Sequence, residues 1–238
     1  MYATNNQFQK AGPKGFIQVK VLENDNLYVR VDLPGVPDDA VRYRVDGVRQ
    51  KIVFFSGESP MEKDGGMREY SGTAGLGCDC CVITNVDAKM KDGVLRMIVS
   101  RVKVNKDDKN KCTLTLPPFT GQSGRHLEDH PYVVKGRKRA FFMGPTKDGV
   151  VHFLVDIPGV SSDDVEVLAN ESEIRFRAEV KNVYEHDDSA RIYIGSINKP
   201  SYSASPSVLN HTIAWDSKFG ALLIVVKPPP SNTDNNTN

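Results

Sequence analysis

The stretch VRVDLPGVPDDAV, from Val29 to Val41, returns almost unchanged as FLVDIPGVSSDDV, from Phe153 to Val165. In both copies an apolar run ends at Asp-Leu-Pro-Gly or Asp-Ile-Pro-Gly, and two adjacent aspartates follow soon afterwards. Proline fixes φ and has no N–H, and glycine permits a sharp reversal, so the phrase predicts a strand that ends in a tight turn. Because the chain contains the phrase twice, we expect two copies of one fold.

The spacing of the repeat divides the chain into two units. Asp32 and Asp156 lie 124 positions apart in a chain of 238 residues, so each half has the usual domain size of roughly 100 to 150 residues. A charged run, NKDDKNK, and a following segment rich in proline and glycine are typical of a linker between them. We predict a short N-terminal tail at 1–13, a first domain at 14–104, a linker at 105–131, a second domain at 132–228 and a disordered tail at 229–238.

Apolar and polar residues alternate in several short segments of both units. In residues 27–33 the aliphatic side chains share one side, while Tyr28, Arg30 and Asp32 take the other, which predicts a strand with one buried face. The same period recurs at 41–45 and 174–178, and we find no apolar stripe with the period of a helix. We therefore expect an all-β protein built as two tandem two-sheet sandwiches, because a single sheet would leave one apolar face in water.

The composition argues against several classes of partner. The chain has 31 Lys and Arg against 30 Asp and Glu, so no strong net charge favours nucleic acid or an anionic membrane. No run approaches the roughly 18 consecutive apolar residues of a membrane span, and the first fifteen residues lack the apolar core of a signal peptide. We expect a protein of the cytosol or nucleus, with reduced cysteines, no membrane contact and no nucleic-acid partner.

A second motif follows the first repeat. Residues 85–99, NVDAKMKDGVLRMIV, read as a strand, a turn at Asp92-Gly93 and a second strand, and Gly93 lies 58 residues after Gly35. A DLPG phrase followed by A-x-x-x-x-G-V-L at this distance resembles the alpha-crystallin domain of plant small heat-shock proteins. The residues that carry the resemblance in the first unit are Asp32, Leu33, Pro34, Gly35, Ser56, Gly57, Glu58, Ala88, Gly93, Val94 and Leu95. The matching residues of the second unit are Asp156, Ile157, Pro158, Gly159, Gly220, Ala221 and Leu222.

The resemblance implies an immunoglobulin-like sandwich that has no catalytic site, needs no cofactor and acts on other proteins. In such domains an extended segment of a partner docks on a sheet edge while its apolar side chains fill a groove between two edge strands. Carried onto this sequence, the residues that line the groove of the first unit are Val41, Tyr43, Val45, Val86, Ala88 and Met90.

The chain departs from the family pattern at three places. Typical members carry a long apolar N-terminal arm and a C-terminal I-x-I/V anchor, whereas the first fifteen residues here are polar or small and SNTDNNTN contains no anchor. The nearest match is Leu114-Thr115-Leu116, which we interpret as either a segment that docks in a neighbouring groove or an apolar contact of the linker. The segment that exchanges between subunits reads Arg68-Glu69-Tyr70-Ser71-Gly72, with tyrosine in place of the family's arginine, which argues against subunit exchange. Two tethered units can instead pair within one chain, and a homodimer is the alternative.

The four cysteines admit a metal-site interpretation. Cys78, Cys80, Cys81 and Cys112 would supply four thiolates, but their spacing is not the C-x2-C of zinc sites. Adjacent cysteines on a strand also point to opposite faces. We therefore expect packing cysteines and no metal.

Other candidate residues have alternative explanations. The cluster KGRKR at 135–139 is either a nuclear-import signal or phosphate contact, or a solvated strand edge that discourages aggregation. Asp38-Asp39 and Asp163-Asp164 are interpreted as turn residues, and no histidine has a catalytic neighbour in the sequence. Trp215 occupies the place of the 85–93 segment, so we expect it in the core or groove, or against a partner.

Our leading hypothesis is a non-enzymatic, chaperone-like adaptor that binds extended segments of partner proteins. The rival hypothesis is an ATP-independent holdase that keeps unfolding proteins soluble under stress. A third class, a CS-domain-type co-chaperone, shares the sandwich but usually lacks the G-V-L phrase.

Overall fold

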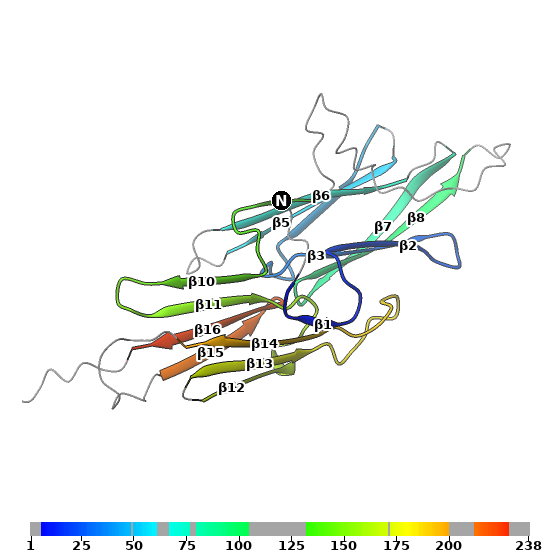
Figure 1. Cartoon of the computed structure of the whole chain (residues 1–238). Helices are drawn as coiled ribbons and strands as arrows, with labels where there is room; N and C mark the ends of the chain where they lie inside the picture. Colours follow the sequence, from blue (N-terminus) through cyan, green and yellow to red (C-terminus); the bar gives the residue numbers. More distant parts are fainter. Residues whose placement is uncertain are drawn as a thin grey trace, which may run out of the picture.

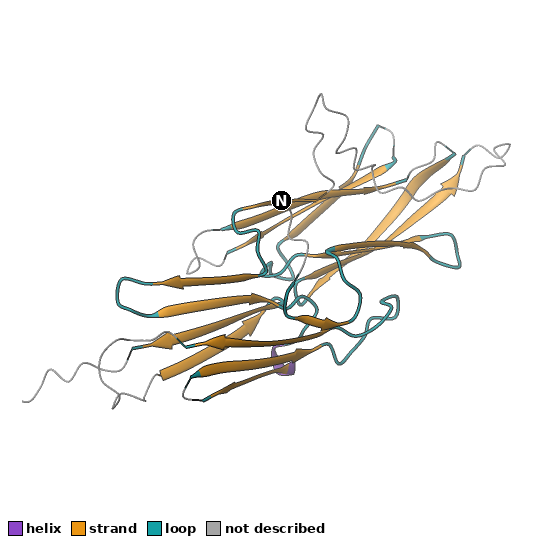
Figure 2. Cartoon of the chain, in the orientation of Figure 1, coloured by secondary structure: helices purple, strands orange, loops and turns teal. Residues whose placement is uncertain are grey.

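A computed structural model describes residues 6–48, 50–60, 67–76, 80–104, 132–170, 172–199 and 212–228. These residues form sixteen strands and one 3-10 turn, η2 (Ser162–Asp164), so the fold is all-β as predicted (Figure 2). The predicted linker, with Leu114 to Leu116, and the predicted C-terminal tail lie outside the described residues, as do Cys78 and Cys112.

The first half of the chain forms a sandwich of two four-stranded antiparallel sheets. One sheet has the order β2-β3-β8-β7 and the other β4-β5-β6-β9. Their strands are β2 (Ile17–Val21), β3 (Leu27–Asp32), β4 (Val41–Val45), β5 (Ile52–Ser59), β6 (Arg68–Gly75), β7 (Cys81–Lys91), β8 (Val94–Lys103) and β9 (Tyr132–Lys135).

The second half repeats this architecture. Its sheets have the orders β10-β11-β16-β15 and β1-β14-β13-β12. Their strands are β1 (Gln9–Ala11), β10 (Phe141–Pro145), β11 (Val151–Asp156), β12 (Val165–Ala169), β13 (Glu173–Glu179), β14 (Ile192–Asn198), β15 (Thr212–Lys218) and β16 (Ala221–Lys227). The two tandem sandwiches predicted from the repeat are therefore confirmed.

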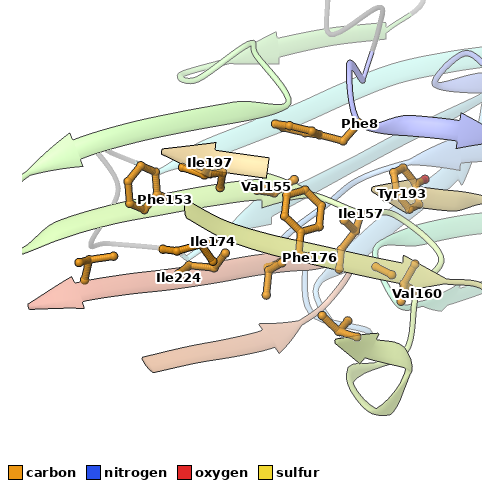
Figure 3. Close-up of a cluster of buried hydrophobic side chains, with 14 of the residues drawn as sticks. Phe8, Phe153, Val155, Ile157, Val160, Ile174, Phe176, Tyr193, Ile197 and Ile224 are labelled. Carbon is orange, nitrogen blue, oxygen red and sulfur yellow. The ribbon is translucent and has the colours of Figure 1, made fainter. Parts of the chain in front are cut away.

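Each sandwich encloses its own apolar core, which the alternating pattern explains. Leu27, Val29 and Val31 of β3 face the first core, opposite Val53 and Phe55 of β5. In the second core, β11 and β16 contribute aliphatic residues, and Phe176 of β13 lies at the centre (Figure 3). Burial of these side chains is the main force that holds the two sheets of each sandwich together.

The two sandwiches exchange strands within one chain. Strand β1, at the N-terminus, pairs with β14 of the second sandwich, and β9, which directly precedes β10, pairs with β6 of the first (Figure 1). The predicted boundaries place residues 9–11 in a tail and residues 132–135 in the second domain, whereas each strand completes a sheet of the opposite sandwich. Local sequence cannot specify which sheet an edge strand joins, because both sheets offer the same unpaired backbone.

The outward face of β3 is also buried, contrary to the prediction of one buried face. All six residues of β3 are buried, including Tyr28 and Arg30. The connection between β13 and β14 of the second sandwich covers this face, where Asp187 accepts a hydrogen bond from the Tyr28 hydroxyl. The alternating pattern identified the two faces of β3 correctly. Its polar face is nevertheless buried, because the connection between β13 and β14 covers it in place of water.

Within the described part of the chain, no helix has the length and apolarity needed to cross a membrane.

Candidate protein-binding site

The candidate groove of the first sandwich lies along the seam between two edge strands, β4 and β7. Strand β4 is an edge strand of one sheet, and β7 is an edge strand of the other. The two edge strands contact each other on the same side of the sandwich. Among the described residues, no strand pairs with the free edge of either one. The unpaired N–H and C=O groups of β4 are thus free to accept another strand.

The residues predicted to line this groove lie on the inner faces of the two edge strands. Val41 and Val45 of β4, and Val86 and Ala88 of β7, are half-buried and pack against the first core. Tyr43 lies between the two valines in sequence and is 45% exposed. Met90 is only 9% exposed and belongs to the core, so it lies beneath the groove rather than along its wall.

The second sandwich has a matching groove between β12 and β15. Register with the neighbouring strands places Val167 at the position of Tyr43, and Trp215 at the position of Ala88. The Trp215 side chain is 42% exposed and lies opposite Ile224 of the core-facing row. The aromatic residue therefore lies on β4 in the first sandwich but on β15, the strand that matches β7, in the second. Trp215 lines the groove and does not lie at the centre of the core.

The aspartate of each repeated phrase is held by an arginine of the other sandwich. Arg68 of β6 donates two hydrogen bonds, of 3.1 and 3.0 Å, to the Asp156 carboxylate, and Arg191 donates one of 2.7 Å to Asp32. All four side chains are buried. Burial alone would lower the pKa of Arg68, but the Asp156 carboxylate raises it above its ordinary value, so the ion pair stays charged.

A tyrosine two residues after each arginine completes the arrangement. The Tyr70 hydroxyl donates to the Pro34 carbonyl oxygen at 2.7 Å, and the Tyr193 hydroxyl donates to that of Pro158 at 2.9 Å. Burial raises the pKa of both tyrosines, so both hydroxyls remain protonated donors at neutral pH. The sequence signal that could have identified this site is an Arg-x-Tyr phrase that recurs at nearly the spacing of the main repeat.

The glycines of the repeated motifs meet where the two sandwiches touch. The Gly35 amide donates to the Phe219 carbonyl at 2.8 Å, and the Gly159 amide donates to the Asp92 carbonyl at 2.8 Å. Gly93 has φ of 72°, and a Cβ there would collide with the carbonyl oxygen of Phe219. The D-L-P-G and G-V-L residues therefore lie at the interface between sandwiches as well as in turns.

One connection of the second sandwich docks on the first. Arg96 of β8 donates to the Asp187 carboxylate at 2.8 Å, and the Tyr184 ring stacks on Tyr28 with 6.1 Å between centroids. Arg30 lies 3.9 Å from the same carboxylate. Because these contacts join the two sandwiches, they add to the strand exchange that unites them.

The cluster KGRKR at 135–139 has a role that neither interpretation of the sequence contained. Lys135 is the last residue of β9, is exposed and pairs with Glu69. Arg137 pairs with Asp156 at 2.8 Å, and its carbonyl oxygen accepts a hydrogen bond from Arg68. This part of the cluster therefore stabilises the contact between the sandwiches.

Cys80 and Cys81 do not point to opposite faces of one strand, as their adjacency had predicted. Strand β7 begins at Cys81, so Cys80 precedes the strand, and the two buried sulfurs lie 3.6 Å apart. Among the described residues, no group of three or more potential ligands converges as a metal site requires.

Comparison with known proteins assigns the family. A profile described as "Predicted plant small heat shock protein" matches residues 1–229. The chain belongs to this plant small heat shock protein family. This small heat shock protein is 43% identical over 107 residues to a 57 kDa protein of Arabidopsis thaliana whose name assigns it to the heat shock proteins. It is 30% identical over 87 residues to a 23.6 kDa mitochondrial heat shock protein of the same plant, and 29% identical over 98 residues to a 14.7 kDa heat shock protein.

The matched segments cover different shares of these relatives. The match covers 44% of this small heat shock protein but 20% of the 57 kDa relative. It covers 34% of the chain and 40% of the 23.6 kDa relative, and 41% of the chain and 72% of the 14.7 kDa relative. The resemblance to small heat-shock proteins stated from the repeated motifs is therefore confirmed.

Proposed function

We propose that this small heat shock protein is a non-enzymatic, chaperone-like adaptor that binds extended segments of partner proteins. The binding site is the free edge of β4 together with the groove between β4 and β7. The observation that carries the proposal is that two unpaired edge strands meet along a row of apolar side chains, with half-buried Val41, Val45, Val86 and Ala88 and an exposed Tyr43. A free sheet edge beside apolar pockets is the arrangement that binds peptides by strand addition.

Family membership supports a second candidate, an ATP-independent holdase. A holdase would use the same apolar groove on segments that partly unfolded proteins expose. The two candidates differ in the state of the partner, because an adaptor binds a defined segment of a folded partner or complex.

We also propose that the protein works in the cytosol or the nucleus. The chain has only four cysteines among 238 residues, fewer than a disulfide framework of the kind found in small secreted domains would need, which supports this compartment. Microscopy of a fluorescent fusion in plant cells tests it, and a signal confined to a secretory organelle or to mitochondria would contradict it.

A groove-filling substitution tests the binding site. The replacement Ala88→Trp introduces the residue that the second sandwich carries at the matching position and fills the space beside Tyr43. We expect it to abolish binding of a fluorescein-labelled peptide of alternating valine and serine, followed by anisotropy. The matched control is Asp87→Trp, which places the same ring on the opposite, exposed face of β7 and should leave binding intact. Equal binding by both variants and the unsubstituted chain would refute the groove as the site.

An aggregation assay separates the two candidates. Citrate synthase is heated with the full chain, and light scattering is recorded with and without the Ala88→Trp substitution. Suppression of scattering near an equimolar ratio, lost in the variant, supports the holdase and counts against the adaptor. Peptide binding without any suppression supports the adaptor.

A further inference from the structure

The two grooves differ in the charge carried by their edge strands. On β4 the outward side chains are Arg42 and Arg44, which alternate with the groove-lining residues. The matching positions on β12 of the second sandwich hold Glu166 and Leu168. All four side chains are exposed, so this difference lies on the surface that an added strand would meet.

The two arginines of β4 are available to a ligand. Among the described residues Arg42 has no ion pair, and the Arg44 guanidinium lies over the Phe54 ring, 4.4 Å from its centroid. This cation–π contact holds Arg44 at the edge of the sheet. Beside both arginines the outer face has an open hollow of about 640 Å³. The same face carries Glu58, two residues beyond Ser56, which lies opposite Arg42, and Glu69, which pairs with Lys135. With Arg42, Arg44 and Lys135 against two glutamates, the face keeps an excess of positive charge.

The arginines on the matching face of the second sandwich are already neutralised. Arg175 pairs with Glu173, and Arg177 pairs with Glu179 at 2.7 Å. Both belong to β13, one strand further from the free edge than β12. A strand added to β12 would therefore meet Glu166 first, which repels acidic side chains.

The geometry of strand addition converts this difference into selectivity. Side chains of an added strand point alternately into the groove and outward, and outward residues lie about 5 Å from their cross-strand neighbours. On the rim of the first groove these neighbours are Arg42 and Arg44. We propose that the first groove selects extended segments in which apolar residues alternate with acidic ones, an inference that rests on the proposed binding function.

Three labelled seven-residue peptides test this selectivity with the full chain. Valine alternates with aspartate, serine or lysine, and binding is measured by fluorescence anisotropy at about 0.1 M salt. Two exposed ion pairs are each weak, so we expect the acidic peptide to bind about three- to tenfold more tightly than the serine peptide. The lysine peptide should bind more weakly than both, and the acidic advantage should shrink at high salt, because exposed charges are screened.

Charge variants locate the effect. The double replacement Arg42→Ser and Arg44→Ser should remove the acidic advantage. The matched control, Arg175→Ser and Arg177→Ser, removes the same charge from the face of the second sandwich and should preserve it. An acidic advantage that survives in the first variant overturns the inference, as does equal binding of the acidic and serine peptides by the unsubstituted chain. If no peptide binds, the proposed function itself fails.

Two further readouts exclude other occupants. Trp215 is the only tryptophan and lines the second groove, so binding of the acidic peptide in the first groove should leave its emission unchanged. A shift in Trp215 emission would place the peptide in the wrong groove and contradict the proposal. A labelled ten-residue oligothymidylate serves as a nucleic-acid probe. Tighter binding of this probe, dependent on Arg42 and Arg44, would overturn an acidic peptide as the ligand.

Discussion

Asp32 ends β3 and Asp156 ends β11, and their carboxylates bind arginines of the opposite sandwich. Each pair is buried, so neither charge can be solvated if its partner is removed. A buried ion pair gives little net stability over an apolar pair, but an orphaned buried charge is costly. The repeated phrase of this chain thus joins the two sandwiches as well as turning the chain.

Replacement of Asp156 by asparagine tests this role. Asp156→Asn keeps the side-chain shape but leaves Arg68 and Arg137 without their counter-charge, so we expect the free energy of unfolding to fall by about 3 kcal/mol or more. Asp32→Asn should cost a similar amount, because Arg191 holds it in the same way. Urea unfolding measures both. As a control, Asp216→Asn breaks an exposed pair with Lys218 and should cost under about 1 kcal/mol; an equal loss would disprove the role of burial.

Two short strands, β1 and β9, join the two sandwiches, although they contain only three and four residues. Strand β1 extends the sheet of β14 and brings Phe8 into the second core. The Phe8 ring packs edge-on against Phe176, with 5.1 Å between centroids (Figure 3). It packs in the same way against Phe141, with 5.6 Å between centroids. The N-terminal residues are therefore part of the second sandwich, although they begin the chain.

Truncation of this ring should weaken the second sandwich. Phe8 is 8% exposed, so Phe8→Ala removes a buried aromatic side chain, and we expect a loss of about 3 kcal/mol. Trp215 belongs to the second sandwich, so its emission during urea unfolding reports the change. Val48→Ala, at a position that is 92% exposed, is the matched control and should change the midpoint little. A Phe8→Ala midpoint equal to that of the unsubstituted chain would show that β1 does not contribute to the core.

In the whole molecule, each sandwich contacts the other through equivalent residues of the repeat. Each supplies a strand, an arginine and a glycine turn to the other. Tyr28, Tyr70 and Tyr193 lie in or beside this interface, and burial raises the pKa of all three hydroxyls above the ordinary value near 10. The interface should therefore respond to alkaline pH.

The sign of this dependence follows from the raised pKa values. Protonated tyrosines favour the folded state, so their contribution is complete below about pH 10 and is lost as the pH rises above it. Each tyrosine then lowers the free energy of unfolding by about 1.4 kcal/mol per pH unit. Urea unfolding between pH 8 and 11 measures the slope. Tyr193→Phe should make it shallower, whereas Tyr43→Phe, at an exposed position, should not; identical slopes for all three proteins would rule out this mechanism.

The six residues predicted to line the groove occupy the core-facing rows of β4 and β7, as their alternation indicates. Five of them are half-buried or exposed. Met90 is more deeply buried than the other five residues. Alternation predicts which face of a strand a side chain occupies but not how deeply it is buried, and Met90, the residue closest to the turn, is covered by the core. Whether these residues bind a partner stays a prediction until the peptide experiments are done.

Periodicity, glycine and proline act over a few neighbouring residues, so the duplication, the strands and the turns can be read from the amino-acid sequence. The exchange of β1 and β9, the burial of the polar face of β3 and the contact between Asp32 and Arg191 depend on how the whole chain folds. These contacts join residues that lie far apart in the chain; Arg191 and Asp32, for example, are 159 positions apart. A local pattern shows that a side chain is polar or that an edge is unpaired. Which group pairs with that side chain or with that edge is decided only when the whole chain has folded.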